Sequence, residues 1–160
     1  NAAETCGVDL TKQITWDSML EDGKKLHAEN PDYYYMNTDT KILCEYVLRP
    51  YLRQMTGESF IIDSEKKMSF TRDQLVEVLT YIKDCYDGGV FEPAEDSATF
   101  KGQIHTNPKW MDGKFIFAYG PSSSINLLMD AVPEAECTVV QMPMAEDRVN
   151  DGYPTVYDSK

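Results

Sequence analysis

Apolar residues recur at three- and four-residue steps in two stretches of the chain, the spacing that places them on one face of an α-helix. The first stretch predicts a helix over residues 16–29, with Thr15 as its N-cap. The second predicts the clearest element of the chain, because Thr71 and Gln74 form a capping-box pattern and Gly88-Gly89 ends the helix. The apolar stripe of this second helix consists of Leu75, Val78, Leu79, Ile82, Cys85 and Tyr86.

A third helix is expected from about residue 40 to residue 56, with a bend near Arg49. The bend follows from Pro50, which lacks the N–H group that a helix interior uses and whose ring clashes with the preceding turn. Residues 59–63 and 68–70 are short runs on either side of a charged turn, and they predict a small hairpin.

Three further segments have the apolar or alternating pattern of short strands, namely residues 33–36, 114–119 and 138–142. A helix over residues 122–131, capped by its serines, is expected between the last two. Residues 92–107 are irregular and polar, which predicts a surface connection with at most a short helix. The predicted fold class is therefore α/β, rich in helix, with a small mixed sheet flanked by helices.

The length and charge of the chain narrow its class. At 160 residues it can bury one hydrophobic core, so residues 3–160 are expected to form a single domain, with Asn1 and Ala2 interpreted as the scar of a cleaved expression tag. Twenty-seven acidic against fifteen basic residues give a formal charge of −12, which repels phosphate backbones and argues against nucleic acid as a partner. The sequence has no apolar run long enough to span a bilayer.

The cysteines and histidines do not form a metal-binding pattern. The four cysteines lie far apart without a CxxC pair, and His27 and His105 are isolated, so neither a metal site nor a cofactor is expected. Cys44 and Cys85 fall on apolar faces of predicted helices, where they are interpreted as free, buried hydrophobic residues rather than disulfide partners. Cys6 lacks the small apolar residues that precede a lipidated cysteine, so it is not expected to be a lipid anchor.

Five short segments follow one another in a distinctive order. Along the chain they are Ile14-Thr15-Trp16-Asp17, Gly88-Gly89-Val90, residues 110–117 (WMDGKFIF), Tyr119-Gly120-Pro121 and Met142-Pro143. This order resembles the sugar-binding family of bacterial extracellular solute-binding proteins, which includes maltose-binding protein. The resemblance extends roughly from Gly7 to Tyr153 and corresponds to the middle of a full-length member. It implies that the chain is an excised fragment containing most of the second lobe of a periplasmic-binding-protein-like fold.

The resemblance implies a function as well as a fold. Members of this family capture a solute outside the cell by closing two lobes over it, and they present it to the transmembrane permease subunits of an ABC importer. The chain is therefore expected to bind a small-molecule solute, a carbohydrate first of all, against the first lobe of the same parent chain, and to catalyse no reaction. The full-length protein is expected to be extracellular and anchored to the cell surface as a lipoprotein.

The resemblance also implies where the ligand binds. The turn after the first strand and the turn that begins at Gly120 look like the two loops that face the cleft between the lobes, and both follow strand ends, where open α/β sheets bind ligands. Side-chain amides, hydroxyls and a carboxylate suit the hydroxyl groups of a sugar, and two tyrosines add aromatic faces. The candidate ligand-binding residues are Tyr35, Asn37, Thr38, Asp39, Tyr119, Gly120, Ser122 and Ser123.

Other interpretations of these residues stay open. Asn37 and Asp39 have the alternative roles of ending a strand and capping a helix, which are the common uses of such residues. Family members often place an aromatic residue where this chain has Ser122, Ser123 and Ser124, so a smaller, more polar or anionic ligand is an alternative to an oligosaccharide. Trp16 and Trp110 occupy apolar positions in or beside helices and are interpreted as core residues rather than as sugar-stacking platforms.

Other classes of function compete with solute capture. A cell-surface adhesion or scaffold module on the same lobe is the second hypothesis, and a carbohydrate-active enzyme is the third. Glu92 and Glu95 could imitate a pair of catalytic carboxylates, but nothing in the sequence fixes their separation, and a solvated surface is expected. Asp147, Asp151, Gly152 and Asp158 occupy positions one, five, six and twelve of a calcium-loop template, but Val149 cannot supply the side-chain oxygen needed at position three. The serines lack the G-x-S-x-G spacing of a nucleophile.

Overall fold

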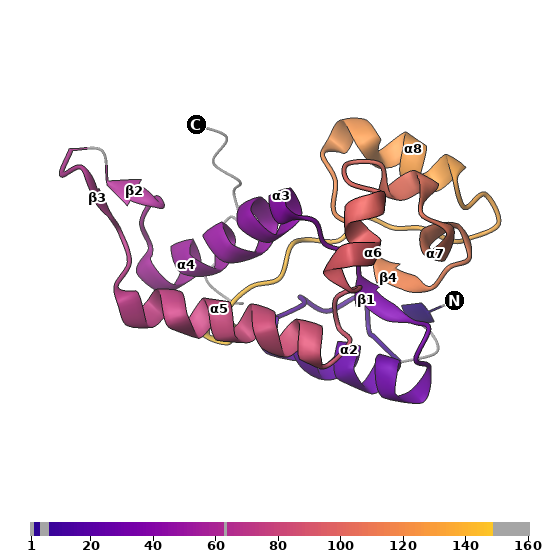
Figure 1. Ribbon diagram of the computed structural model, residues 1–160, viewed down its shortest axis with the longest axis horizontal. Coiled ribbons are helices and arrows are strands. Elements are labelled where there is room, and N and C mark those ends of the chain that lie inside the picture. Colours follow the sequence, from indigo (N-terminus) through magenta and orange to yellow (C-terminus); the bar gives the residue numbers. More distant parts are fainter. Residues whose placement is uncertain (1, 4–6, 63, 149–160) are drawn as a thin grey trace.

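The computed structural model describes residues 2–3, 7–62 and 64–148, and helices make up most of its regular structure (Figure 1). The α-helices are α2 (Trp16–Glu29), α3 (Thr40–Ile42), α4 (Arg49–Thr56), α5 (Arg72–Asp87), α6 (Ala94–Thr99), α7 (Pro108–Met111) and α8 (Ile125–Asp130). The other helical elements are a π-helix, η1 (Leu43–Leu48), and the 3-10 turns η2 (Ile104–Thr106), η3 (Ser122–Ser124) and η4 (Glu146–Arg148). The strands are β1 (Tyr34–Met36), β2 (Ile61–Ile62), β3 (Lys67–Met68) and β4 (Phe115–Phe117). Asn1, Cys6 and most of the calcium-loop template lie outside the described residues.

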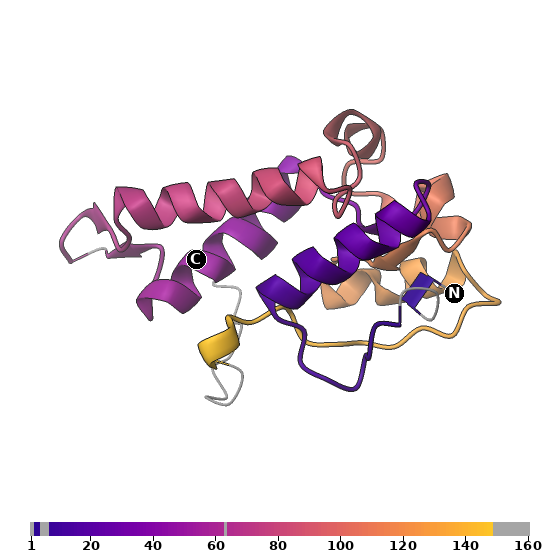
Figure 2. The same ribbon diagram turned by 90° about the horizontal axis from the view of Figure 1, so that it is seen from below.

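Within the described residues the strands form two small sheets, which lie toward opposite ends of the molecule (Figures 1 and 2). β1 and β4 pair in parallel, with Tyr34 opposite Phe115 and Met36 opposite Phe117, and α6, α7 and α8 gather around them. β2 and β3 form the predicted antiparallel hairpin, which projects beyond the ends of α4 and α5. The helix-rich α/β class is confirmed, with its parallel and antiparallel pairs in separate sheets.

α2 and α5 both begin with a capping box. Thr15 Oγ1 accepts a hydrogen bond from the Ser18 N–H at 3.0 Å, and Ser18 Oγ accepts one from the Thr15 N–H at 2.9 Å. Thr71 and Gln74 make the same reciprocal pair at α5. Each box satisfies N–H groups that would otherwise lack a partner at the helix start. Both predicted helices are confirmed, and each begins directly after its capping threonine.

The irregularity predicted at Pro50 is the π-helix that joins α3 to α4. The Arg49 N–H donates to the carbonyl of Cys44, five residues earlier, directly before the proline that has no N–H to donate. Ile42 and Val47, also five residues apart, are the buried side chains of this stretch. Cys44 lies off that stripe and is exposed, so its predicted burial is wrong. The prediction used the 3.6-residue period of an α-helix, whereas a π-helix has a longer period. Cys44, between Ile42 and Val47, was therefore assigned to the buried face although its side chain is exposed.

The strand expected over residues 138–142 is not formed. The segment is extended but has no ladder of hydrogen bonds to β1 or β4, and Val139 is 74% exposed. Pairing begins only at Met144, which forms an isolated parallel bridge to Thr15. A strand needs a neighbour for its backbone groups, and an apolar run cannot by itself supply one.

The helix that follows β4 begins differently from the prediction. Its first turn is η3, whose N-cap is Pro121 with extended backbone (φ −66°, ψ 155°), and Ser124 occupies the N-cap position of α8. The serines lie inside the first turn, and none of their side chains makes a capping hydrogen bond to η3 or α8. The predicted capping by serine side chains is therefore wrong, although Ser124 holds the N-cap position of α8, because its backbone already lies in the helical region (φ −96°, ψ −5°).

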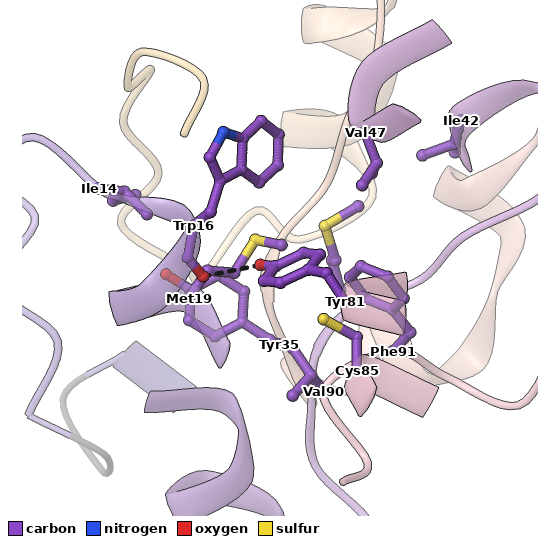
Figure 3. Packing of buried hydrophobic residues seen from close by; sticks show 11 residues of the cluster. Ile14, Trp16, Met19, Tyr35, Ile42, Val47, Tyr81, Cys85, Val90 and Phe91 are labelled. Atoms are coloured by element: carbon purple, nitrogen blue, oxygen red, sulfur yellow. Dashed lines mark hydrogen bonds between the residues drawn. The ribbon is translucent and has the colours of Figure 1, made fainter. Parts of the chain in front are cut away.

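The hydrophobic core is built around Trp16 of α2 and Tyr81 of α5 (Figure 3). Trp16 is 1% exposed and stacks on Tyr51 with the ring centroids 4.9 Å apart, while Tyr81 meets both rings edge-on. The Tyr81 hydroxyl donates to the Trp16 carbonyl at 2.7 Å. Cys85 lies beside Tyr81 and is fully buried and free. The core roles predicted for Trp16 and Cys85 are confirmed.

The packing of α2 against the segment after α5 depends on Gly23. A Cβ atom at this position would lie 2.6 Å from Cγ1 of Val90. We expect Gly23→Ala to lower the free energy of unfolding by about 1 to 3 kcal/mol through overpacking, although alanine in an open helix is favoured over glycine by about 1 kcal/mol. Urea denaturation measures the change, and adding Val90→Ala should make Gly23→Ala less harmful. A Gly23→Ala protein as stable as the wild type would contradict this packing.

Burial of weakly acidic groups in the core makes stability sensitive to alkaline pH. Burial raises the pKa of the Cys85 thiol from 9.0 to about 12 and the pKa of Tyr51 from 10.0 to about 12. Stability gained from a raised pKa is present below the unfolded-state value and is lost as the pH rises through the folded-state value. We therefore expect the free energy of unfolding to fall between about pH 9 and pH 12, as measured by urea titration. In Cys85→Ala the free energy of unfolding should begin to fall at a higher pH. If its dependence on alkaline pH is the same as in the wild type, ionisation of Cys85 is not the cause of the fall.

Candidate functional site

The two loops singled out from the sequence leave the β1–β4 sheet at the same edge. β1 ends at Met36 and β4 at Phe117, and these residues are partners in the parallel register. The turn that begins at Asn37 and the segment that leads to Gly120 therefore both start at the carboxyl edge, where open α/β sheets bind ligands.

A cavity of about 610 Å³ runs along β4 and past its carboxyl end, between β4, α8 and the segment 135–143. Most of its walls are apolar or aromatic, and its volume lies in the range of about 300 to 1,000 Å³ that is typical of ligand pockets. Trp110 is one of the wall residues; it is partly buried, and its Nε1 donates to the Leu128 carbonyl at 3.0 Å. The candidate residues that line the cavity, here called the cavity group, are Tyr35, Tyr119, Gly120 and Ser122.

Tyr119 lines the cavity and combines an aromatic ring with a buried hydroxyl group. Its ring stacks on Tyr46 of η1, with the centroids 5.3 Å apart and the planes at 9°. Its hydroxyl is buried and has no hydrogen-bond partner among the described residues. Burial raises the pKa of Tyr119, so the buried phenol holds its proton and is a hydrogen-bond donor without an acceptor among the described residues. Tyr35, the other aromatic member, is 1% exposed and packs on Phe117 with the centroids 4.8 Å apart.

The polar turn after β1 is buried and does not line the cavity. Asp39 Oδ1 accepts the Ile42 N–H at 2.8 Å, which makes Asp39 the N-cap of α3. Of the two roles considered for Asp39, helix capping is therefore the one that the structure shows. The Thr38 hydroxyl shares a 2.7 Å hydrogen bond with the Tyr86 hydroxyl. Asn37 is 2% exposed, and its Oδ1 has no hydrogen-bond partner in the part of the chain that the structure describes. The side chains of Thr38 and Asp39 are thus engaged inside the protein.

The serine turn after β4 lies at the surface. Ser122 and Ser123 are both exposed. Ser122 lines the cavity, whereas Ser123 does not. The structure therefore separates the candidate residues into the cavity group, the buried turn over residues 37–39, and Ser123, which belongs to neither.

Glu92 is a buried charged residue that the sequence pattern missed. Its side chain is 0% exposed, whereas Glu95 is exposed, so the expected solvated surface is wrong for Glu92. Its carboxylate accepts hydrogen bonds from Lys109 Nζ at 2.8 Å and from Ser97 Oγ at 2.9 Å. Asn107 Nδ2 adds a third contact at 3.2 Å. The carboxylate thus receives the donors that a buried charge requires.

Lys109 is the cation of this buried group. Desolvation lowers the pKa of Lys109, but hydrogen bonds to Glu92 and to Asp96 outweigh it, and the pKa is raised. The ammonium group also lies 5.4 Å from the centroid of the Tyr34 ring. One signal for the burial of Glu92 was present in the sequence, because Glu92 directly follows the apolar pair Val90-Phe91.

Comparison with known proteins bears on the fold of this site. No protein-family model matches the chain, and no curated protein matches it. The crystal structure of a periplasmic solute-binding protein from Pectobacterium atrosepticum is similar to the chain, with a TM-score of 0.67 and 19% sequence identity over 89% of this chain and 35% of that protein. The fold is that of a solute-binding-protein lobe. The solved protein is much longer than the stretch that this lobe matches.

The lobe has a second, more polar hollow of about 320 Å³ at the start of α2, against α4 and α5. Trp16 and Tyr51 form part of its wall, together with carboxylates that include Asp17 and Glu77. Across the described ranges, no group of three or more His, Cys, Asp and Glu side chains is placed to hold a metal ion. No helix in those ranges has the length and apolar character needed to cross a bilayer.

Proposed function

We propose that the chain is the ligand-binding lobe of an extracellular solute-binding protein, which captures a carbohydrate for an ABC importer. The observation that carries the proposal is the cavity of about 610 Å³ that runs along β4 and past its carboxyl end, in a lobe with this fold. Aromatic and hydroxyl groups of the cavity group meet there. The lobe works by capture and release, without covalent chemistry.

The lining of the cavity favours a neutral sugar over an anionic solute. A sugar ring has apolar C–H faces and a rim of hydroxyl groups, which aromatic walls and hydroxyl side chains can match. Tyr119 supplies a protonated phenol and Ser122 a hydroxyl. Among the described wall residues the charged side chain is Glu136, an anion, and the chain as a whole carries a formal charge of −12. Both charges oppose the entry of an anion.

Capture in this scheme depends on the rest of the parent protein. The first lobe closes over the cavity by a hinge motion, and the transmembrane permease subunits then accept the solute. The parent protein is placed outside the cell, anchored to its surface as a lipoprotein. These partners and this location follow from the proposed transport role.

Calorimetry of the full-length protein tests the proposal. Titration with glucose, maltose, a tripeptide and inorganic phosphate should give heat of binding with at least one sugar and none with phosphate. Binding of the peptide or phosphate alone would show that the carbohydrate assignment is wrong. Absence of binding across a wide panel, together with adhesion of the protein to cell-wall material, would favour the adhesion module instead.

Tyr119→Phe is expected to weaken sugar binding by about three- to tenfold, the equivalent of one lost hydrogen bond. Stability should stay level or rise, because the lost hydroxyl is buried without a partner among the described residues. Tyr81→Phe is the matched control: its hydroxyl donates to the Trp16 carbonyl, so stability should fall while sugar affinity holds. Calorimetry and thermal denaturation measure the two effects. Equal sugar affinity of Tyr119→Phe and wild type would remove Tyr119 from the site.

A further inference from the structure

A buried carboxylate is linked to the polar turn after β1 by two hydrogen bonds. The Thr38 N–H donates to Ser97 Oγ at 3.4 Å, and the Ser97 hydroxyl donates to Glu92 Oε2 at 2.9 Å. The exposed fractions of Thr38, Ser97 and Glu92 are 1%, 0% and 0%. A serine hydroxyl has one proton, so its donation to Glu92 leaves the oxygen lone pairs to accept the Thr38 N–H. The charge of Glu92 therefore fixes the direction of the Ser97 hydroxyl.

Glu92 is itself held from several directions. Besides Ser97, Lys109 Nζ donates to Oε1 at 2.8 Å and Asn107 Nδ2 to Oε2 at 3.2 Å. Asn107 Oδ1 also accepts the backbone N–H of Lys109 at 2.9 Å, which fixes the Asn107 amide with its Nδ2 toward Glu92. Burying a carboxylate costs several kcal/mol, and a well-packed apolar side chain is often equally stable in its place. The stability of the fold therefore does not explain why a charged residue is present here. A charge does, however, orient the hydrogen-bond donors around it.

The turn connects Glu92 to the aromatic wall of the cavity. Thr38 is followed by Asp39, which caps α3 through the Ile42 N–H, and α3 continues directly into η1. η1 carries Tyr46, which stacks on Tyr119 and lines the cavity with it. Thr38 thus lies directly before the cap of the helical stretch that carries Tyr46, and its hydroxyl also bonds to that of Tyr86 at 2.7 Å.

We propose that Glu92 is a positioning residue for the solute cavity. Through Ser97 it holds Thr38, and through α3 and η1 it sets the ring of Tyr46 against Tyr119. Glu92 does not line the cavity and acts without touching the solute. The inference rests on the proposed function, which makes this cavity the binding site.

Amide hydrogen exchange in the full-length protein tests the link without any solute. In Glu92→Gln and in Ser97→Ala, exchange of the Thr38 amide is expected to be about tenfold faster, and exchange across η1 about three- to tenfold faster. The amides of α5 should keep their wild-type rates. Asp96→Asn is the matched control, because it removes the other carboxylate partner of Lys109 and leaves the bonds of Glu92 in place.

Each outcome decides the proposal. Unchanged exchange at Thr38 and η1 in both variants would overturn it, and so would equally faster exchange in α5, which would show that Glu92 serves global stability only. Ser97→Ala decides alone if Glu92→Gln does not fold, since it retains the pair of Glu92 with Lys109. Faster exchange at Thr38 with an unchanged η1 would also overturn it, because the turn would then not reach the aromatic wall.

Calorimetry with maltose as the probe separates this inference from the proposed function. If the wild type binds maltose, Ser97→Ala should bind it about three- to tenfold more weakly and Asp96→Asn equally well. Unchanged maltose affinity in Ser97→Ala would overturn the positioning role. A wild type that binds neither maltose nor any other sugar would contradict the proposed function, while the exchange data would still decide the link between Glu92 and η1.

Discussion

Trp16→Ala is expected to lower the free energy of unfolding by about 3 to 5 kcal/mol. Trp16 is 1% exposed, and its removal would leave a cavity against the stacked ring of Tyr51 and the edge of Tyr81. Its Nε1 also donates to Gln54 Oε1 at 2.8 Å, a bond that ties α2 to α4. Because domains of this size are stable by only about 5 to 15 kcal/mol, the variant should unfold at a much lower urea concentration.

Trp16→Phe is the control that separates volume from the indole hydrogen bond. It keeps an aromatic ring in the core and should lose about 1 to 2 kcal/mol. In this variant Gln54 Oε1 still accepts the Ala145 N–H at 2.7 Å, so the side-chain oxygen of Gln54 keeps a hydrogen-bond partner. A loss below about 1 kcal/mol for Trp16→Ala would show that the core does not depend on this ring.

Lys109→Met is expected to lower the free energy of unfolding by about 3 kcal/mol, because it leaves the carboxylate of Glu92 buried without its cation. The methionine retains most of the apolar stem, so the change isolates the charge. The side chain of Lys109 is 27% exposed, which places the effect at the low end for a buried pair. Urea denaturation at pH 7 measures it.

Two further variants show whether the lost charge causes this effect. Lys109→Met combined with Glu92→Gln should be less destabilised than the sum of the single changes, since no uncompensated charge then remains. Asp96→Asn removes the more exposed partner of Lys109 and should cost no more than about 1 kcal/mol. An Asp96→Asn protein as unstable as Lys109→Met would contradict the central role of Glu92.

Elements specified by neighbouring residues could be predicted, and those that depend on distant partners could not. α2 and α5 carry their capping boxes within three residues of their starts, so the sequence contains the whole signal. The segment 138–142 has the pattern of a strand, but its pairing depends on a neighbour that the pattern does not specify. Cys44 was misplaced for a related reason, since a π-helix changes the period on which burial was predicted.

The candidate site shows the same limit. Tyr35 and Tyr119 reach the cavity because strand ends locate the carboxyl edge, which local patterns reveal. Glu92 was missed because two of its three donors are remote in sequence: Asn107 lies 15 residues away and Lys109 lies 17 residues away. A glutamate is predicted to be solvated when local sequence does not show the donors that the fold brings to it.

The isolated bridge between Thr15 and Met144 has a practical consequence. The Met144 N–H donates to the Ile14 carbonyl at 3.0 Å and the Trp16 N–H to the Met144 carbonyl at 3.1 Å, so these two distant stretches of the chain lie side by side. Junctions with a host protein placed at residues 14 and 144 would therefore be close together, with little stretching of the host backbone. Movement of the lobe would then pull on both junctions together, which makes it a suitable sensing element for a fused reporter.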